Sequence, residues 1–492
     1  GDHGVDRNGP NCAGRTCRGL MVCPCPGRTY VERVNRPTSL RKPRAHRPGL
    51  HRHHVVIVGA GFGGLAAARA LADAPVDVTI VDAHNHHTFQ PLLYQVATAG
   101  LGGDDVTYAT RGIFHRQANA SVRMGRVIGG DLDEHRLDLA DGSSLGYDHL
   151  VLAAGAVSDT FGIPGVAQHA FGLKSLRDAL AVRAQVLSCF EEADARPELI
   201  EDGLINVVIT GGGPTGVELA GGMAELIDRV LAHDFPRLDL RRARVVLVEM
   251  GDSLLASFHP KLGAKAKATL EQRGVEVLLG TTVDEMRAEE VVLSGPLLGK
   301  GATIPAHTKI WAAGVRASPL GDALGLADGP SGRIPVRADL SVAEHPEIFA
   351  IGDVASAHDG DDGSVLPQLA PVAMQGGEHA AAMIGRRLNG EATEAFSYTD
   401  KGTMATIGRA SAVAQLPGGI RLSGLLGWLA WLALHLVQLV GFRNRANVLV
   451  NWAWNYVTYD RASRIIPEAE VGPEQVTPAF RSDSGGIHPP EK

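Results

Sequence analysis

Cysteine is scarce in this chain of 492 residues. It occurs five times, and four of the five cysteines lie before residue 26, which leaves Cys189 alone in the remainder of the sequence. A fold built from that remainder cannot contain an intramolecular disulfide, and any mechanism that needs a redox-active cysteine pair is excluded. The spacing of the first four cysteines matches no common zinc pattern, so we expect no metal site.

Positive charge is outnumbered outside the N-terminal region. The chain carries 47 Lys and Arg against 54 Asp and Glu, and residues 1–53 hold 11 of the basic residues but 3 of the acidic ones. The acidic remainder argues against a nucleic acid as partner. Residues 1–53 are rich in Arg and Pro, and we expect a disordered extension or an over-extended reading frame there. Residues 467–492, rich in Pro, Glu and Ser, are expected to form a disordered tail.

Long hydrophobic runs are also missing. The segment Gly424–Val440 has 17 residues, two of them polar, which falls short of the roughly 20 apolar residues that span a bilayer comfortably. We therefore expect it to lie on a membrane rather than cross it. In the stretch that follows, Asn447, Asn451 and Asn455 recur every fourth residue and draw one polar stripe along an otherwise apolar helix.

Aromatic residues make up 5% of the chain, yet four of its five tryptophans fall between Trp428 and Trp454. The surrounding residues 421–466 contain five Arg and one Asp. A cationic, tryptophan-rich and amphipathic segment on an acidic protein is typical of an interfacial anchor to anionic lipid. A dimer interface or a buried helix pair would produce a similar pattern, and both uses are compatible with an anchor.

Glycine, in contrast, is abundant, and two glycine-rich turns share one pattern. VVIVGAGFGG at residues 55–64 and VVITGGGPTG at residues 207–216 each follow a β-branched run and open a helix-like stretch. Such glycines permit a tight turn beside a pyrophosphate, whose charge the free N–H groups of the helix N-terminus attract. Two copies predict two bound dinucleotides. The candidate contacts are Gly59, Gly61, Gly63 and Gly64 in the first turn and Gly211, Gly213 and Gly216 in the second.

An acidic residue closes the strand after each turn. Asp82 lies 23 residues after Gly59, where an acid usually binds the ribose hydroxyls of the adenosine half. Glu249 lies 38 residues after Gly211, a longer spacing than usual. In the same role, Glu249 would repel a 2′-phosphate and favour NADH over NADPH. The alternative for both is a solvated acid at a strand end.

Two later apolar segments end in small residues, as expected where the backbone passes close to a cofactor. LVLAAGA at residues 150–156 contains Gly155, and IFAIGDVA at residues 348–355 contains Gly352 and Asp353. An Asp after a Gly at a strand end can hydrogen-bond the hydroxyls of a ribityl chain. These residues are further candidates for cofactor binding.

More specific motifs stand elsewhere in the chain. They are FQPLLYQVATAGL at 89–101, LPQLAPVAMQGGEHAA at 366–381, DKGTMATIGRASAV at 400–413 and GFRNR at 441–445. Together with the two turns, in this order, the chain resembles type II NADH dehydrogenase, of the pyridine nucleotide-disulfide oxidoreductase superfamily, from about His54 to Ile466. The resemblance implies an α/β fold with two Rossmann-like domains, for FAD and for NADH, and a C-terminal membrane-anchoring helical segment.

The resemblance also divides the chain. The expected FAD-binding domain comprises residues 54–165 and 330–395, the NADH-binding domain residues 166–329, and the region for membrane association and dimerisation residues 396–466.

Three catalytic residues follow from the resemblance. It implies that Glu218 faces the flavin and the nicotinamide, that Gln375 lies near the flavin on the quinone side, and that Lys401 approaches the isoalloxazine. The alternative interpretations are structural. Glu218 would be an acidic residue in the first turn of a helix, Gln375 a polar residue with its hydrogen bonds satisfied, and Lys401 a surface lysine. Some members of the family carry Gln where this chain has Pro371, which leaves Gln375 as the single motif glutamine there.

The implied activity is transfer of a hydride from NADH to FAD and of two electrons onward to menaquinone or ubiquinone, without proton pumping. The resemblance places a homodimer on the cytoplasmic face of the plasma membrane. A sulfide:quinone oxidoreductase is excluded because Cys189 alone cannot supply a cysteine pair. A membrane-docked flavoprotein reductase or NADH-responsive redox sensor with a different acceptor remains the alternative.

Overall fold

The computed structural model describes residues 52–359, 364–458, 461 and 463–466. The expectations for residues 1–51 and 467–492 therefore lie outside the described residues, as does the side chain of Asn455.

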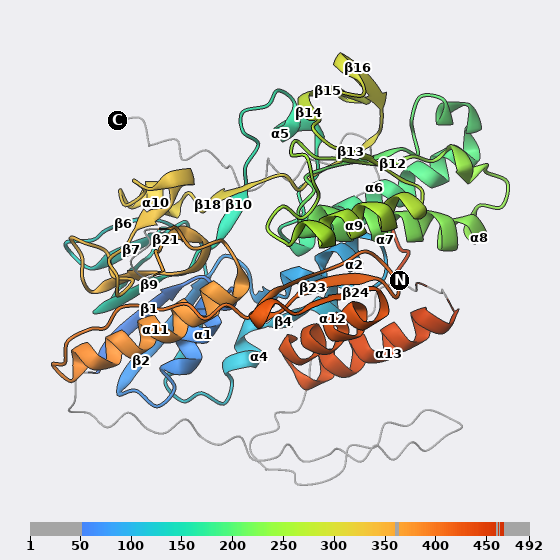
Figure 1. Ribbon diagram of the computed structural model, residues 1–492. Coiled ribbons are helices and arrows are strands. Elements are labelled where there is room, and N and C mark those ends of the chain that lie inside the picture. The colour runs from blue at the N-terminus through green and yellow to red at the C-terminus, as the bar shows by residue number, and fades with distance from the viewer. Residues whose placement is uncertain (1–51, 360–363, 459–460, 462, 467–492) are drawn as a thin grey trace, which may run out of the picture. The chain divides into compact units, whose positions relative to one another are not determined.

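A five-stranded parallel sheet, here called the first sheet, begins the fold (Figure 1). Its strands, in spatial order, are β20 (Ile348–Ala350), β9 (His149–Leu152), β1 (His53–Val58), β2 (Val76–Asp82) and β5 (Ala120–Met124). Residues Val55–Val58 of the central strand β1 form an uninterrupted buried apolar run, because both faces of a parallel sheet are covered. Helices α1 (Phe62–Ala70) and α11 (Ala370–Leu388) pack side by side on one face.

A second parallel sheet carries the second glycine turn. Its order is β13 (Val275–Leu278), β12 (Val245–Val248), β11 (Val207–Thr210) and β17 (Thr308–Trp311). Its helices are α6 (Leu176–Ala195), α7 (Pro214–Glu225) and α9 (Pro260–Gln272). The chain passes between the two sheets twice, and the two connections pair as antiparallel strands β10 (Ala156–Ser158) and β18 (Val315–Ala317).

Two small antiparallel sheets accompany the parallel ones. Strands β6 (Val127–Asp131), β7 (Arg136–Leu139) and β8 (Ser144–Gly146) form one, and β14 (Thr282–Met286), β15 (Glu290–Gly295) and β16 (Gly299–Pro305) form the other. Each is inserted in the chain between elements of its parallel sheet.

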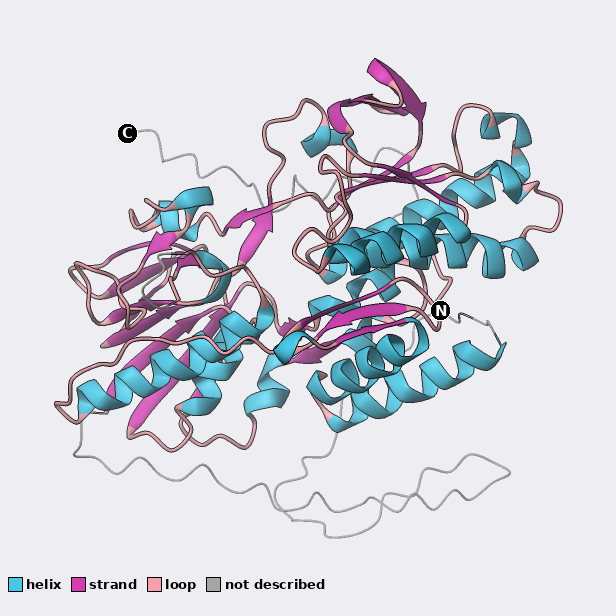
Figure 2. Cartoon of the chain, in the orientation of Figure 1, coloured by secondary structure: helices cyan, strands magenta, loops and turns pink. Residues whose placement is uncertain are grey.

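The C-terminal region is a three-stranded antiparallel sheet with a helical hairpin (Figure 2). The strands are β22 (Thr403–Thr406), β23 (Ala412–Gln415) and β24 (Arg421–Ser423), and the helices are α12 (Gly424–Gln438) and α13 (Phe442–Thr458). Trp431, Val448 and Trp452 belong to the same hydrophobic core as the second sheet and α2 (Leu93–Ala97). The hairpin is therefore packed into the fold on one side.

Helix α13 directs Asn451 of the predicted stripe, and also Asn444, toward the protein. Asn444 is buried and donates to the carbonyl oxygens of Asp104, Asp105 and Thr107 at 3.2, 3.3 and 2.8 Å. Asn451 Nδ2 donates to the Asp105 carboxylate at 2.9 Å. The inner side of α13 thus combines these two asparagines with the buried Val448 and Trp452.

The outer side of the hairpin is apolar. On α12, Leu425, Leu426 and Val437 are 55%, 67% and 67% exposed, and on α13, Val450 and Trp454 are 65% and 58% exposed. We call these five residues the apolar face. Within the described ranges, every helix is too short or too polar to cross a membrane.

Candidate active site

The first glycine turn joins β1 to α1. Gly59 has φ +109°, and a Cβ there would stand 2.2 Å from the carbonyl oxygen of Ala153. A Cβ on Gly64 would lie 1.8 Å from the carbonyl oxygen of Gly59, so both positions require glycine. Gly61, the residue before α1, faces open space. The unbonded N–H groups of the first helical turn therefore adjoin a free volume suited to a pyrophosphate.

Asp82 closes this turn from the end of β2. Its Oδ2 accepts from the Ala60 N–H at 2.6 Å and its Oδ1 accepts from the His84 N–H at 2.7 Å. Burial alone would raise the pKa of Asp82, but the hydrogen bonds from His84 and Ala60 outweigh it and lower the pKa. Asp82 is consequently an ionised acceptor fixed beside the turn, with lone pairs left for a ribose.

The second turn, between β11 and α7, repeats the first. Gly211 has φ +111°, and a Cβ there would stand 2.6 Å from the carbonyl oxygen of Ala312. A Cβ on Gly216 would lie 1.8 Å from the carbonyl oxygen of Gly211, and Gly213 faces open space before α7. The two turns are thus equivalent in conformation and in the close contacts that demand glycine.

Glu249 occupies the place of Asp82 in the second turn despite its longer spacing in the sequence. Its Oε2 accepts from the Gly212 N–H at 2.5 Å, and its Oε1 accepts from the Gly251 N–H at 2.6 Å. The Gly211 N–H donates to the Val248 carbonyl at 2.8 Å, as the Gly59 N–H does to the Val81 carbonyl. Both carboxylates are therefore held at the same point of the same motif.

The carboxyl edge of the first sheet gathers the remaining cofactor candidates. Gly155 follows β9 with φ +70° and faces open space. Gly352 follows β20 with φ +66°, and a Cβ there would stand 2.8 Å from the Ala373 Cβ in the first turn of α11. A Cβ on Gly63 would approach the Ala373 carbonyl to 3.0 Å. The N-terminal turns of α1 and α11 therefore meet at this edge.

Asp353 follows Gly352 at this edge. Burial raises the pKa of its carboxyl, and the positive charges of Lys174 and Arg333 act against that rise. The Asp353 carbonyl accepts from Gln368 Nε2 at 3.0 Å. Lys174, which precedes α6, was not indicated by any sequence motif, because it lies far from Asp353 in the chain.

Glu218 lies on the second turn of α7 and is 8% exposed. The Thr406 N–H of β22 donates to its Oε1 at 3.2 Å. Burial raises the pKa of Glu218 to about 8, although the Thr406 N–H and the adjacent Trp431 indole act in the opposite direction. Because no charged group lowers this pKa, Glu218 keeps its proton near pH 7.

Trp431 of the helical hairpin lies beside Glu218 and belongs to a cluster of aromatic rings. The His435 ring stacks on Trp431 at a centroid distance of 4.1 Å, and Trp431 also contacts Tyr94 and Trp452. Burial lowers the pKa of His435 to about 4, with a hydrogen bond to the Trp431 carbonyl acting against it, so His435 is neutral at pH 7. Neither the cluster nor His435 was indicated by the motifs.

A cavity of about 60 Å³ is lined by Thr406 and by Gly222 and Glu225 of α7. Arg461 and Glu225 form an ion pair at its wall, with Arg461 NH2 3.0 Å from Glu225 Oε1. Arg461 NH1 also donates to the Thr98 carbonyl at 2.6 Å. This pair fastens the segment after α13 to α7 and α2. No sequence motif indicated it, because the partners lie far apart in the chain.

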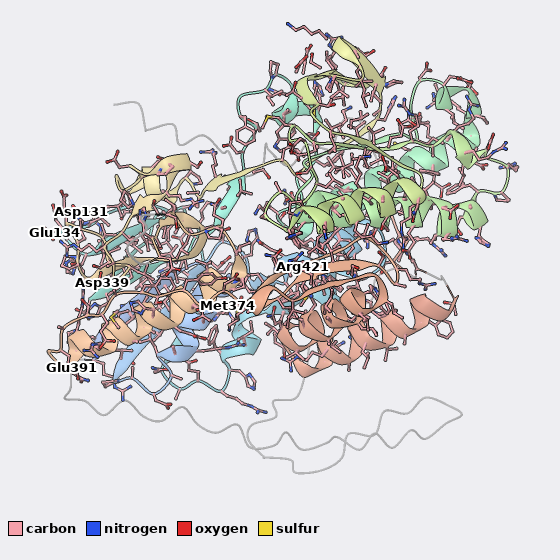
Figure 3. All side chains as sticks on the ribbon, viewed as in Figure 1. Asp131, Glu134, Asp339, Met374, Glu391 and Arg421 are labelled. Atoms are coloured by element: carbon pink, nitrogen blue, oxygen red, sulfur yellow. The ribbon has the colours of Figure 1, made fainter. Side chains whose placement is uncertain are left out.

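Gln375 and Lys401 are joined to Glu218 by one segment, residues 399–406. The side-chain amide of Gln375 makes two hydrogen bonds with the backbone of Thr399. Its Nε2 donates to the Thr399 carbonyl at 3.0 Å, and its Oε1 accepts from the Thr399 N–H at 3.0 Å. Lys401, two residues later, is exposed, and Thr406 holds Glu218. Figure 3 labels Met374, the neighbour of Gln375, at the end of α11 that approaches β22–β24.

Comparison with known proteins agrees with this geometry. The pyridine nucleotide-disulphide oxidoreductase family profile matches residues 53–377, and the NDH2 C-terminal domain profile matches residues 401–458. The type II NADH:quinone oxidoreductase NdhA of Mycobacterium tuberculosis is 40% identical over 428 residues, which cover 84% of this chain and 89% of NdhA. The chain belongs to the type II NADH:quinone oxidoreductase family.

Other relatives support the same family and fold. Ndh of M. tuberculosis, a type II NADH:quinone oxidoreductase, is 37% identical, with 88% of this chain and 93% of Ndh covered. The structure of NDH2 from Plasmodium falciparum in complex with NADH superposes with a TM-score of 0.76 at 19% identity. That comparison covers 85% of this chain and all of NDH2, and it shows the fold. The predicted family and the pyridine nucleotide-disulfide oxidoreductase fold are confirmed.

Protonation of Glu218 generates a prediction for stability. A carboxyl whose pKa is about 8 when folded and 4.5 when unfolded binds more protons in the folded state between those values. Stability that Glu218 contributes is therefore lost as pH rises from about 5 to 8. We expect Glu218→Gln to lessen the fall of the thermal unfolding midpoint across that interval.

Glu198→Gln, at an exposed carboxylate, serves as the control and should follow the wild-type profile. Parallel profiles for Glu218→Gln and wild type would contradict a raised pKa at Glu218.

Proposed function

We propose that this chain oxidises NADH and passes the electrons through bound FAD to a membrane quinone, menaquinone or ubiquinone. The observation that carries the proposal is the pair of equivalent glycine turns, each closed by its own carboxylate, in a chain of the type II NADH:quinone oxidoreductase family. Two turns fit two dinucleotides, and open space beside Gly61 and Gly213 fits their phosphates.

The residues divide between the two dinucleotides. Bound FAD would accept a hydride from NADH and release two electrons to the quinone. We assign Gly59, Gly61, Gly63, Gly64 and Asp82 to the adenosine and pyrophosphate half of FAD, and Gly155, Gly352 and Asp353 to its ribityl and ring half. We assign Gly211, Gly213, Gly216 and Glu249 to NADH.

Glu218 is the proposed proton-holding residue. Its carboxyl keeps a proton near pH 7 in a site enclosed by Trp431 and His435, and such a group can exchange a proton with a neighbouring reactant. Gln375 holds Thr399, and through it the segment that carries Lys401. We therefore assign Gln375 to the positioning of Lys401 as well as to the quinone side.

The apolar face is the proposed membrane contact. Its five residues lie on the hairpin that also borders Glu218, so docking on a lipid surface would bring a bilayer quinone toward the site. We propose a peripheral homodimer on the cytoplasmic face of the plasma membrane. Arg443 and Arg445, both exposed, would favour anionic lipid.

The activity is tested by anaerobic stopped-flow absorbance on the purified protein. NADH should bleach the flavin spectrum, and a soluble quinone should then restore it. Bleaching without quinone-dependent recovery would reject the quinone as acceptor. It would favour an NADH-responsive redox sensor or a flavoprotein reductase with a different acceptor. A protein purified without flavin, and unable to bind added FAD, would reject the cofactor assignment.

Nucleotide selectivity tests Glu249. Because the carboxylate would repel a 2′-phosphate, Glu249→Gln should lower the ratio of kcat/KM for NADH over NADPH by about tenfold. Asp252→Asn removes the same charge from an exposed position three residues away and should leave the ratio near that of the wild type. Unchanged selectivity in Glu249→Gln, or an equal change in both variants, would reject the ribose role.

Vesicle binding tests the apolar face. Leu426→Glu on α12 or Val450→Glu on α13 should weaken cosedimentation with phosphatidylglycerol vesicles by about tenfold or more, since each removes an apolar contact and adds a negative charge. Leu297→Glu, 77% exposed between β15 and β16, is the control and should bind as the wild type does.

NADH oxidation with a soluble quinone should survive both substitutions. Loss of the dimer in sedimentation, with unchanged vesicle binding, would assign the face to subunit contact instead.

A further inference from the structure

Phe161 lies in the loop that follows β10, and it combines an exposed side chain with an unfavourable backbone. The residue is 61% exposed. Its φ of +50° falls in the left-handed region, which a bulky residue rarely adopts. Such a conformation costs free energy and persists where the surrounding structure imposes it, which occurs most often at ligand sites. The loop is therefore a candidate for a role in binding.

Three hydrogen bonds through Asp159 fix this loop on the end of β17. Asp159 Oδ1 accepts from the Phe161 N–H at 2.9 Å, and the Asp159 carbonyl accepts from Trp311 Nε1 at 2.7 Å. The Asp159 N–H donates to the Gly314 carbonyl at 3.1 Å. The position of Phe161 is consequently set by the second sheet.

The ring of Phe161 lies over Gly314. A Cβ on Gly314 would stand 2.4 Å from Cζ and 2.7 Å from Cε2 of the ring. The ring also makes a T-shaped contact with Trp311, at a centroid distance of 6.4 Å. These two contacts place the Phe161 ring just beyond the carboxyl end of β17.

The same end of β17 lies against the second glycine turn. A Cβ on Gly211 would approach the Ala312 carbonyl oxygen to 2.6 Å and the Ala313 Cα to 2.7 Å. Gly314 directly follows Ala313 in the chain. The Phe161 ring and the second turn therefore contact one short stretch of backbone.

The order of the strands decides which half of a dinucleotide comes toward Phe161. In the second sheet, β12 and β17 lie on opposite sides of β11. Glu249, assigned to the adenosine ribose, follows β12, and the turn assigned to the pyrophosphate follows β11. A dinucleotide bound across the carboxyl ends of these strands extends its other half toward β17. In NADH, that half carries the nicotinamide.

We propose that Phe161 is an NADH-binding residue whose ring packs against the nicotinamide ring. The inference rests on the proposed function, because it requires NADH at the second turn. An aromatic side chain offers a large apolar surface of fixed shape, on which a flat heteroaromatic ring can stack. Presentation of the ring at the end of β17 accounts for the left-handed backbone of Phe161.

The test compares two ligands in calorimetric titrations of the full-length holoenzyme. ADP-ribose contains every part of NAD⁺ except the nicotinamide ring, so the pair isolates this one contact. Phe161→Ala should weaken NAD⁺ binding about tenfold and ADP-ribose binding by less than about twofold. Phe161→Tyr keeps the ring and should bind both ligands as the wild type does.

Leu297→Ala, 77% exposed between β15 and β16, is the matched control and should leave both affinities unchanged. Glu249→Gln acts on the adenosine half, so it should weaken both ligands to the same extent.

Phe161→Gly decides the question if Phe161→Ala does not fold. Glycine adopts a positive φ without strain, so this variant removes the ring and leaves the backbone unstrained. It should show the same selective loss of NAD⁺ binding.

Two results would overturn the role of Phe161. One is an equal loss of NAD⁺ and ADP-ribose binding, which a general disturbance of the loop would cause, and the other is unchanged binding of both. In either case, NAD⁺ binding and NADH-dependent bleaching in the wild type would leave the proposed function standing. A wild-type protein that binds neither ligand would instead overturn the proposed function itself.

Discussion

The hydrogen bond from the Thr406 N–H to the buried Glu218 carboxyl connects the three parts of the site. Glu218 belongs to the helix after the second glycine turn, and Thr406 ends the strand that begins just after Lys401. The same segment starts at Thr399, whose backbone carbonyl and N–H both hydrogen-bond to the side-chain amide of Gln375. A shift of β22 would therefore disturb the proton-holding acid, the lysine and the end of α11 together.

The two dinucleotide sites follow from a repeated local constraint. In each turn, a backbone N–H donates a hydrogen bond to the carboxylate at the end of the next strand. Two glycines in each turn allow close contacts that a Cβ atom would block. The sequence predicted both turns. It also suggested Glu249, although the spacing from Gly211 to Glu249 was longer than usual. The added residues lie in α7, in its continuation to Asp234 and in the connection to β12, so the strand end remains in place.

Long-range contacts limited what the sequence could predict. The Asn stripe of α13 was visible, but the inward orientation of Asn451 depends on Asp105 in a segment more than 300 residues earlier. The pKa of Glu218 depends on enclosure by β22 and by Trp431 of α12, which no local pattern encodes. Lys174 had no motif, because its charge acts on Asp353, which lies far from it in the sequence. Local turn chemistry was predictable, whereas burial and charge pairing between distant segments were not.

Burial makes Glu218 a neutral acid at physiological pH. Infrared difference spectroscopy between acidic and alkaline pH, on wild type and on Glu218→Gln, tests it most directly. A protonated-carboxyl band should disappear with a midpoint near pH 8 and should be absent from the variant. A wild-type spectrum without that band, or one in which the band titrates near the ordinary value of 4.5, would contradict it.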